Sequence, residues 1–188
     1  MASNGLVWLT HIVQLDVGAV FLVAGASKVT TPRIFAETVA EYRIAPRSIT
    51  NVAAVSLIAA ELLVGMAVSA GWPLMLGLGG AGLCLLAFAV GVTVNLRRGR
   101  AISCGCFGAR GERIGWPILA RIGLLAVGVV FVAASSLLAG VPPLRVGENR
   151  SAELVATLGL ASGVAMVVGW LLYAPQLLAV LRGAKPTH

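Results

Sequence analysis

The chain has 188 residues, of which 59% are hydrophobic before its 23 glycines are counted, only 11% are charged, and the formal net charge is +7. An ordinary soluble domain has roughly 45–50% apolar residues with glycine included, so much of this apolar surface has to face lipid. The composition therefore excludes a water-soluble protein. The basic residues are sorted into a few loops, which argues against a nucleic-acid-binding face.

Five apolar stretches are each long enough to cross a bilayer, which takes about 20 helical residues. Backbone groups inside a membrane need internal hydrogen bonds, so these stretches are predicted helices and not strands of a barrel. They cover residues 7–27, 49–70, 74–96, 116–139 and 154–174. We predict an all-α, polytopic membrane helical bundle of about five transmembrane helices, forming a single integral-membrane domain over residues 1–188.

A short helix is predicted between the first two spans. Thr31 and Pro32 are typical of an N-cap and a first helical residue. Apolar residues then recur at helical spacing until Pro46. This pattern favours a helix lying on the membrane surface.

The distribution of Lys and Arg predicts the orientation, because basic residues close to the spans are retained on the cytoplasmic side. Eleven of the 14 basic residues fall on one side, namely Lys28, Arg33, Arg43, Arg47, Arg97, Arg98, Arg100, Arg110, Arg113, Arg182 and Lys185. Only Arg145 and Arg150 fall on the opposite side. In the inner (plasma) membrane, we expect the N-terminus outside, with the C-terminus and the loop 97–115 in the cytoplasm.

A cleaved signal peptide ending near residues 24–26 is the competing interpretation of the first span. It is disfavoured because no basic region precedes the segment and Asp16 interrupts its apolar core.

The most informative stretch is the Ser-Cys-Gly-Cys-Phe-Gly run at residues 103–108, which lies in the most basic loop. Residues two apart can bring their Cα atoms within the ~4.4–6.8 Å that a disulfide tolerates, and Gly105 lacks the Cβ that would crowd so small a ring. Such a bond is strained and easily reduced, so it suits electron transfer better than bracing a fold. Cys104 and Cys106 are therefore the candidate redox couple.

The surroundings of this pair favour the reactive thiolate. Arg98, Arg100 and Arg110 flank it, and the helix predicted to begin near Trp116 directs the positive end of its dipole toward the loop.

Other interpretations of the cysteines remain open. Cys104 and Cys106 are alternatively two ordinary thiols in a glycine-rich turn. A zinc site within the chain is disfavoured because the only histidines, His11 and His188, are far away in the sequence. We therefore expect no metal, although a site shared between subunits or a Cu(I) ion stays open. We also expect no cofactor. Cys84, in the third span, is expected to be a packing residue, unless the loop folds back to use it as a resolving thiol.

Three ionisable residues fall within the predicted spans, where such groups are costly and often functional. Asp16 and Glu61 lie near the middle of the first and second spans, and Arg121 lies about one turn into the fourth. Arg121 is the expected partner of Glu61, with Gln14 and Asn95 joining through hydrogen bonds. The pair either fixes helix register or relays protons released by thiol oxidation.

Small residues predict close helix contacts. Gly77, Gly79, Gly80 and Gly82 crowd the third span. Gly159 and Gly163 form a small-xxx-small face in the last span, which is weak support for a homodimer.

Several of these positions, taken in order, resemble the MauE family, which is allied to the DoxX-like membrane proteins. They are Gly25-x-x-Lys28, Phe35, Tyr42, Pro46, Glu61-x-x-x-Gly65, Asn95 with Gly99, Cys104-Gly105-Cys106-Phe107-Gly108 and Arg121. The resemblance covers roughly residues 10–140, which leaves residues 141–188 as an extra C-terminal span and tail. It implies a small multi-pass membrane protein, named for methylamine utilisation, that helps a thioredoxin-like partner handle the disulfides of methylamine dehydrogenase.

The resulting hypothesis is a membrane protein that supports thiol–disulfide exchange with a thioredoxin-like partner or a disulfide-containing client. An extracytoplasmic client favours cysteines outside, whereas the charge distribution predicts them inside, and we follow the charges. The alternatives are a non-catalytic membrane scaffold or chaperone for a redox enzyme, and a small-molecule transporter using Asp16 and Glu61. Whether the chain is itself an enzyme stays open.

Overall fold

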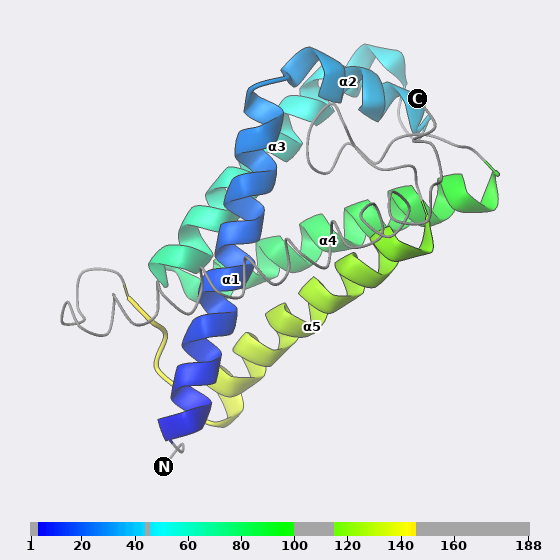
Figure 1. The fold of residues 1–188 in the computed structure, drawn as a ribbon. Helices are drawn as coiled ribbons and strands as arrows, with labels where there is room; N and C mark the ends of the chain where they lie inside the picture. The colour runs from blue at the N-terminus through cyan, green and yellow to red at the C-terminus, as the bar shows by residue number, and fades with distance from the viewer. Residues whose placement is uncertain (1–3, 44–45, 100–114, 146–188) are drawn as a thin grey trace, which may run out of the picture. The chain divides into compact units, whose positions relative to one another are not determined.

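The computed structural model describes residues 4–43, 46–99 and 115–145 (Figure 1). It contains four long helices, α1 (Asn4–Val29), α3 (Thr50–Ala70), α4 (Leu74–Arg97) and α5 (Trp116–Leu138). A short helix α2 (Pro32–Glu41) and a 3-10 turn η1 (Arg47–Ile49) join α1 to α3, and the described ranges contain no strand. Each long helix is long and apolar enough to cross a membrane. The all-α, multi-span prediction is confirmed, and the fifth expected span, 154–174, lies outside the described residues.

The chain divides into two compact units, residues 1–148 and 149–188. Every described residue belongs to the first unit, so the fold below is the fold of that unit. The assignment of the whole chain to one domain stays a prediction.

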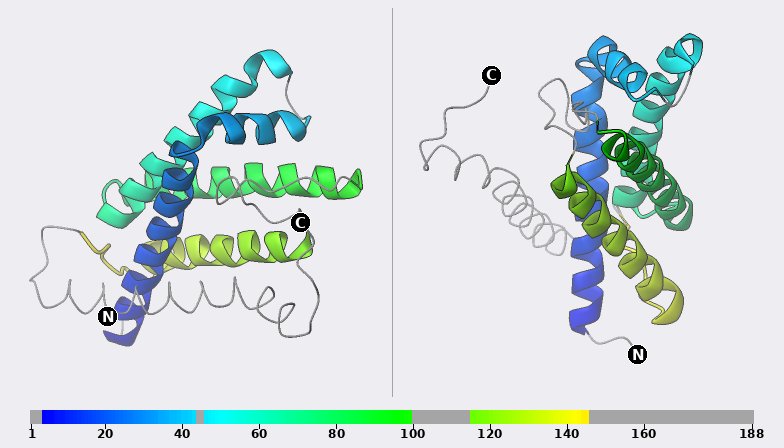
Figure 2. Two further views of the ribbon diagram at one scale, coloured as in Figure 1. Left: turned by 45° about the horizontal axis from the view of Figure 1, so that its top comes forward. Right: turned by 90° about the vertical axis from the view of Figure 1, so that its right-hand side faces the viewer.

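The four long helices pack so that each contacts two of the others. α1 contacts α3 and α5, and α4 contacts the same two helices; the left view of Figure 2 shows α4 and α5 running side by side. Their shared core consists of the apolar side chains Val17, Phe21, Val64, Val68, Leu74, Leu78, Ala81, Cys84, Leu85, Val129 and Val132. Many other large apolar side chains of the spans are exposed on the outside of the helices, as lipid contact requires.

Helix α2 begins as the sequence predicts, with Thr31 at the N-cap and Pro32 directly after it. The Thr31 hydroxyl does not cap the helix and donates instead to the Ser27 carbonyl oxygen, 3.4 Å away. α2 packs chiefly on α3, where Phe35 is buried against Ala54 and Ile58. The amphipathic segment therefore covers one end of α3.

Glycines bring α1 and α3 unusually close. A Cβ on Gly18 would collide with Ser69, one on Gly25 would lie 2.9 Å from the Leu62 side chain, and one on Gly65 would lie 2.9 Å from the Leu22 backbone nitrogen. In α4, Gly77 and Gly80 face α3 in the same way, whereas a Cβ on Gly79 or Gly82 would meet open space. The close contact predicted for Gly77, Gly79, Gly80 and Gly82 is thus made by two of these four glycines.

Candidate functional site

A buried ion pair joins the end of α1 to the middle of α3. The Lys28 ammonium donates to both carboxylate oxygens of Glu61, at 2.7 and 2.8 Å, and to the Ala24 carbonyl oxygen at 3.3 Å. The two side chains are 0% and 2% exposed. The close approach at Gly25 and Gly65 brings the helices near enough for this contact, because a larger side chain at either position would hold them apart.

Aromatic rings from two other helices enclose the ammonium. Its nitrogen lies 5.3 Å from the ring centre of Phe35 in α2 and 5.6 Å from that of Phe88 in α4. Both distances suit cation–π attraction, which strengthens where water is excluded. Lys28 thus connects α1, α2, α3 and α4 at one point.

Cys84 of α4 lies beside this pair. Its thiol is buried and free, and it is close enough to interact electrostatically with both Glu61 and Lys28. It also belongs to the main apolar core, which agrees with the packing role expected from the sequence.

The structure corrects two expectations from the sequence. The partner of Glu61 is Lys28 and not Arg121, which is half-buried in α5. Lys28 was also counted among the loop residues that set the orientation, but it is the last-turn residue of α1 and has no exposed surface. Removing it leaves ten basic residues against two, so the charge asymmetry persists.

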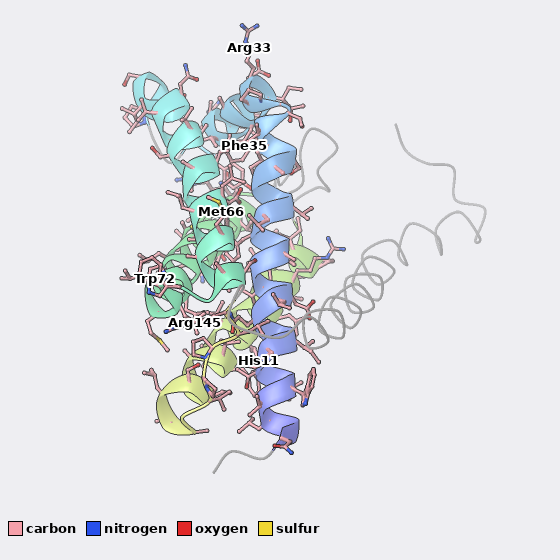
Figure 3. The ribbon with its side chains drawn as sticks, turned by 90° about the vertical axis from the view of Figure 1, so that its left-hand side faces the viewer. His11, Arg33, Phe35, Met66, Trp72 and Arg145 are labelled. Carbon is pink, nitrogen blue, oxygen red and sulfur yellow. The ribbon has the colours of Figure 1, made fainter. Side chains whose placement is uncertain are left out.

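Gln14 and Asn95 were expected to join Glu61 and do not. The Gln14 amide nitrogen donates to the carbonyl oxygens of Val68 and Leu144, at 2.9 and 3.0 Å, and its oxygen accepts from the Leu144 backbone N–H at 3.1 Å. Gln14 therefore ties the segment after α5 to α1 and α3. The His11 ring nitrogen, 3.1 Å from the Pro142 carbonyl oxygen, holds the same segment, and Figure 3 shows His11 and Arg145 toward one end of α1 and Phe35 toward the other.

Asn95 organises the end of α4 from which the cysteine loop departs. Its amide nitrogen donates to the carbonyl oxygens of Tyr42 and Gly91, at 3.2 and 3.0 Å. Arg98 lies one turn further on and contacts the Arg43 carbonyl oxygen at 3.5 Å. Burial raises the pKa of Tyr42 to about 12, so its hydroxyl stays protonated at neutral pH.

The predicted redox residues themselves fall outside the described ranges. Cys104, Gly105, Cys106, Arg100 and Arg110 all lie between residues 100 and 114. Of the other predicted site residues, Arg98 is exposed at the end of α4 and Asp16 is partly exposed on α1. No group of three or more potential metal ligands occurs in the described part of the chain.

Sequence reasoning missed Lys28 as a site residue because a lysine two residues before the polar pair Thr30 and Thr31 looks like a loop residue. A usable signal existed, since Gly25 precedes Lys28 by three residues and Gly65 follows Glu61 by four. Both motifs place a small residue one turn from a charge, the arrangement that two helices need to bring their charges into contact.

Comparison with known proteins identifies one family. The family model described as "Methylamine utilisation protein MauE" matches residues 6–139, which is more than half of the chain. The matched region contains the ion pair, the Cys-Gly-Cys run, the whole of α3, α4 and α5, and α1 from residue 6 onward. Neither the search of curated proteins nor the search of solved structures found a match.

Proposed function

Because this chain belongs to the MauE family, we propose that it is a membrane component of thiol–disulfide exchange, with Cys104 and Cys106 as its redox couple. The client is a disulfide-containing protein, handled together with a thioredoxin-like partner, as in the processing of methylamine dehydrogenase. The observation that carries the proposal is the position of the Cys-Gly-Cys run between two spans, inside the matched region.

The bounds of α4 and α5 support this position. α4 ends at Arg97 and α5 begins at Trp116. Cys104 is seven residues beyond α4, which limits it to roughly 25 Å from the end of that helix. The pair is therefore available to a partner that works at the membrane surface, and the arginines of the loop favour its thiolate form.

The proposed reaction balances without a cofactor. One cysteine thiolate attacks the partner's disulfide, forms a mixed disulfide and releases one partner thiolate. The second cysteine then attacks the mixed disulfide, which leaves a Cys104–Cys106 bond and a partner dithiol. Two electrons and two protons pass from this chain to the partner, and reversing the same steps oxidises the partner.

The buried ion pair supports this reaction by fixing the frame from which the loop departs. Lys28 contacts Phe88 and Glu61, so α4 is held against α3 and α1. Asn95 then ties the end of α4 to Tyr42 after α2. Arg98, Arg100 and Arg110 are proposed to tune the thiols, whereas Glu61 acts in positioning. Proton transfer by Asp16, and a role of Arg121 in fixing helix register, are secondary parts of the proposal.

The proposal includes an orientation in the inner (plasma) membrane. The N-terminus is outside, and the C-terminus and the cysteine loop are cytoplasmic, because ten basic residues lie on that side even without Lys28. The partner that exchanges disulfides directly with Cys104 and Cys106 is then on the cytoplasmic side.

Trapping of the mixed disulfide tests the proposal. Cys104→Ser and Cys106→Ser are expressed singly, and membrane proteins are separated without reductant after acid quenching of thiols. We expect one of the two variants to accumulate an adduct with a thioredoxin-fold protein, because its resolving thiol is missing. Cys84→Ser serves as the control and keeps the wild-type pattern. No adduct in either variant, together with an unchanged client in the double variant, contradicts the proposal.

A scaffold role is the second candidate, and the complete burial of the Lys28–Glu61 ion pair favours a scaffold over a transporter. Side chains that are 0% and 2% exposed are closed to a permeating solute, whereas a scaffold needs only a fixed frame. A scaffold tolerates loss of both loop cysteines but not loss of Glu61, so the double Cys→Ser variant separates the two functions.

A further inference from the structure

Two arginines meet where α2 and α4 end. Arg98 directly follows α4, and one nitrogen of its guanidinium group lies 3.5 Å from the carbonyl oxygen of Arg43, which follows α2 and Tyr42. Both arginines are exposed. Among the described residues, no acidic side chain forms an ion pair with either guanidinium group. The contact therefore brings two positively charged residues together without a counter-ion from that part of the chain.

The backbone of Arg43 is in the left-handed region, with a φ of 48°. Four of the described residues have a positive φ, and the other three are glycines, at positions 71, 99 and 140. A residue with a Cβ is destabilised in this region by a steric clash that glycine avoids. Asn95 and Arg98 hold the segment by contacting the carbonyl oxygens of Tyr42 and Arg43. An arginine at a position that suits glycine indicates a use for its side chain.

The two arginines lie at the level of the lipid headgroups. Trp116, at the start of α5, is 76% exposed, and exposed tryptophan is typical of the membrane–water interface. Ile118 packs with Tyr42 and Leu96 in one apolar cluster, so the start of α5, the end of α4 and the residues after α2 share one depth. α4 has 24 residues, or about 36 Å of helix, which reaches across a hydrocarbon core about 30 Å thick. The guanidinium groups are therefore placed where the phosphates of phospholipids lie.

We propose that Arg43 and Arg98 form a binding site for the phosphate of an anionic phospholipid such as phosphatidylglycerol. A guanidinium group has five N–H donors and binds phosphate oxygens through paired hydrogen bonds. Arg98 uses one donor on the Arg43 carbonyl oxygen and offers the others to the lipid. Anionic phospholipids carry a net negative charge that zwitterionic ones lack, so two adjacent positive charges favour the anionic lipid. The bound phosphate supplies the counter-ion and joins the segment after α2 to the end of α4.

Native mass spectrometry of the full chain tests the site independently of the redox function. The purified protein is mixed in detergent with phosphatidylglycerol and phosphatidylcholine of the same acyl chains, and the retained lipid is counted. Arg43→Gly removes the guanidinium group and relieves the backbone, so it separates lipid binding from folding. Arg98→Gln removes the second charge. Arg33→Gln, which changes an exposed arginine near the opposite end of α2, is the control for loss of charge alone.

We expect the wild-type chain to retain phosphatidylglycerol in preference to phosphatidylcholine by roughly tenfold or more. Arg43→Gly and Arg98→Gln should each reduce that preference about fivefold, the ratio expected for one basic residue near a membrane surface. Without lipid, Arg43→Gly should unfold at the same or a higher temperature, because glycine suits a φ of 48°. Arg33→Gln should keep the wild-type preference.

Three results overturn the proposal. The first is a wild-type chain with no preference for phosphatidylglycerol. The second is a loss of preference in Arg33→Gln as large as in Arg43→Gly and Arg98→Gln, or a preference that survives both of these substitutions together, since other basic residues then attract the lipid. The third is displacement of the lipid by excess inorganic phosphate, which means that the site takes soluble phosphate.

Discussion

Two buried polar contacts hold α1 in the bundle, and they differ in kind. Near the C-terminal end of α1, the charged side chains of Lys28 and Glu61 form an ion pair with a nitrogen–oxygen distance of 2.7 Å. In its N-terminal half, Gln14 uses a neutral amide to bind the backbone of Val68 and Leu144. A neutral contact can be lost at the cost of unmade hydrogen bonds, whereas loss of one charge leaves its partner ionised in an apolar core. The two ends should therefore respond very differently to mutation.

Glu61→Gln should be the most damaging of the conservative substitutions, since it leaves the Lys28 ammonium buried without a counter-ion. Breaking a buried pair in this way costs about 3–5 kcal/mol. Lys28→Met combined with Glu61→Gln removes both charges and should recover most of that loss. Thermal unfolding in detergent, followed by circular dichroism, measures both variants.

Glu37→Gln is the control for this pair of variants, because Glu37 is exposed on α2 and its loss should change little. If the double variant is no more stable than Glu61→Gln alone, the ion pair does not have the energetic role assigned to it.

Gly71→Ala should destabilise the end of the bundle where Gln14 and Leu144 meet, away from the ion pair. Gly71 has a φ of 71°, and a Cβ there would collide with the carbonyl oxygen of Leu144. Gly99 has a φ of 64° with nothing within 4 Å of a built Cβ, so Gly99→Ala carries only the backbone penalty. We expect Gly71→Ala to cost about 1–3 kcal/mol more than Gly99→Ala. Equal unfolding temperatures for the two variants would show that the segment after α5 does not pack against Gly71.

Gln14→Leu should cost less than Glu61→Gln, about 1–3 kcal/mol, because it leaves neutral backbone groups unpaired. The substitution keeps the volume of the side chain, so the loss comes from the hydrogen bonds to Val68 and Leu144. Protease cleavage after Arg145 should also become faster, since the segment loses its hydrogen bonds to Gln14 and keeps the contact of His11 with Pro142. An effect as large as that of Glu61→Gln contradicts the distinction between the two contacts.

Tyr42 should give the smallest effect, and only in alkali. Burial raises its pKa to about 12, above the value of about 10 for an unfolded chain. Between these values the folded protein binds more protons than the unfolded chain, so stability falls as the pH rises above 10. Ultraviolet titration of a Tyr173→Phe variant, in which Tyr42 is the remaining tyrosine, should give a midpoint near 12; a midpoint near 10 contradicts burial.

The sequence predicted the four described spans to within about three residues, because uninterrupted apolar stretches of this length have few alternatives in a membrane. It also predicted α2 from Thr31 and Pro32. These features depend on local composition and on a proline at the first helical position, and both can be read directly from the sequence.

The side-chain partners were not predictable in the same way. Glu61 was matched with Arg121 because both lie in spans, yet the register of α1 on α3 decides the pairing, and that register depends on Gly18, Gly25 and Gly65 fitting against particular side chains. The bonds of Gln14 depend on Leu144, 130 residues away. Such long-range contacts follow from packing, and no local pattern encodes them.

The most direct test of the proposed function is the redox state of Cys104 and Cys106 in living cells. Free thiols are blocked with one isotopic form of a permeant maleimide, disulfides are reduced, and the released thiols take the second form before mass spectrometry. The account predicts a Cys104–Cys106 bond whose occupancy rises in oxidising medium and falls in reducing medium, while Cys84 stays a thiol throughout. If Cys104 and Cys106 carry only the first label in both media, the redox role is contradicted.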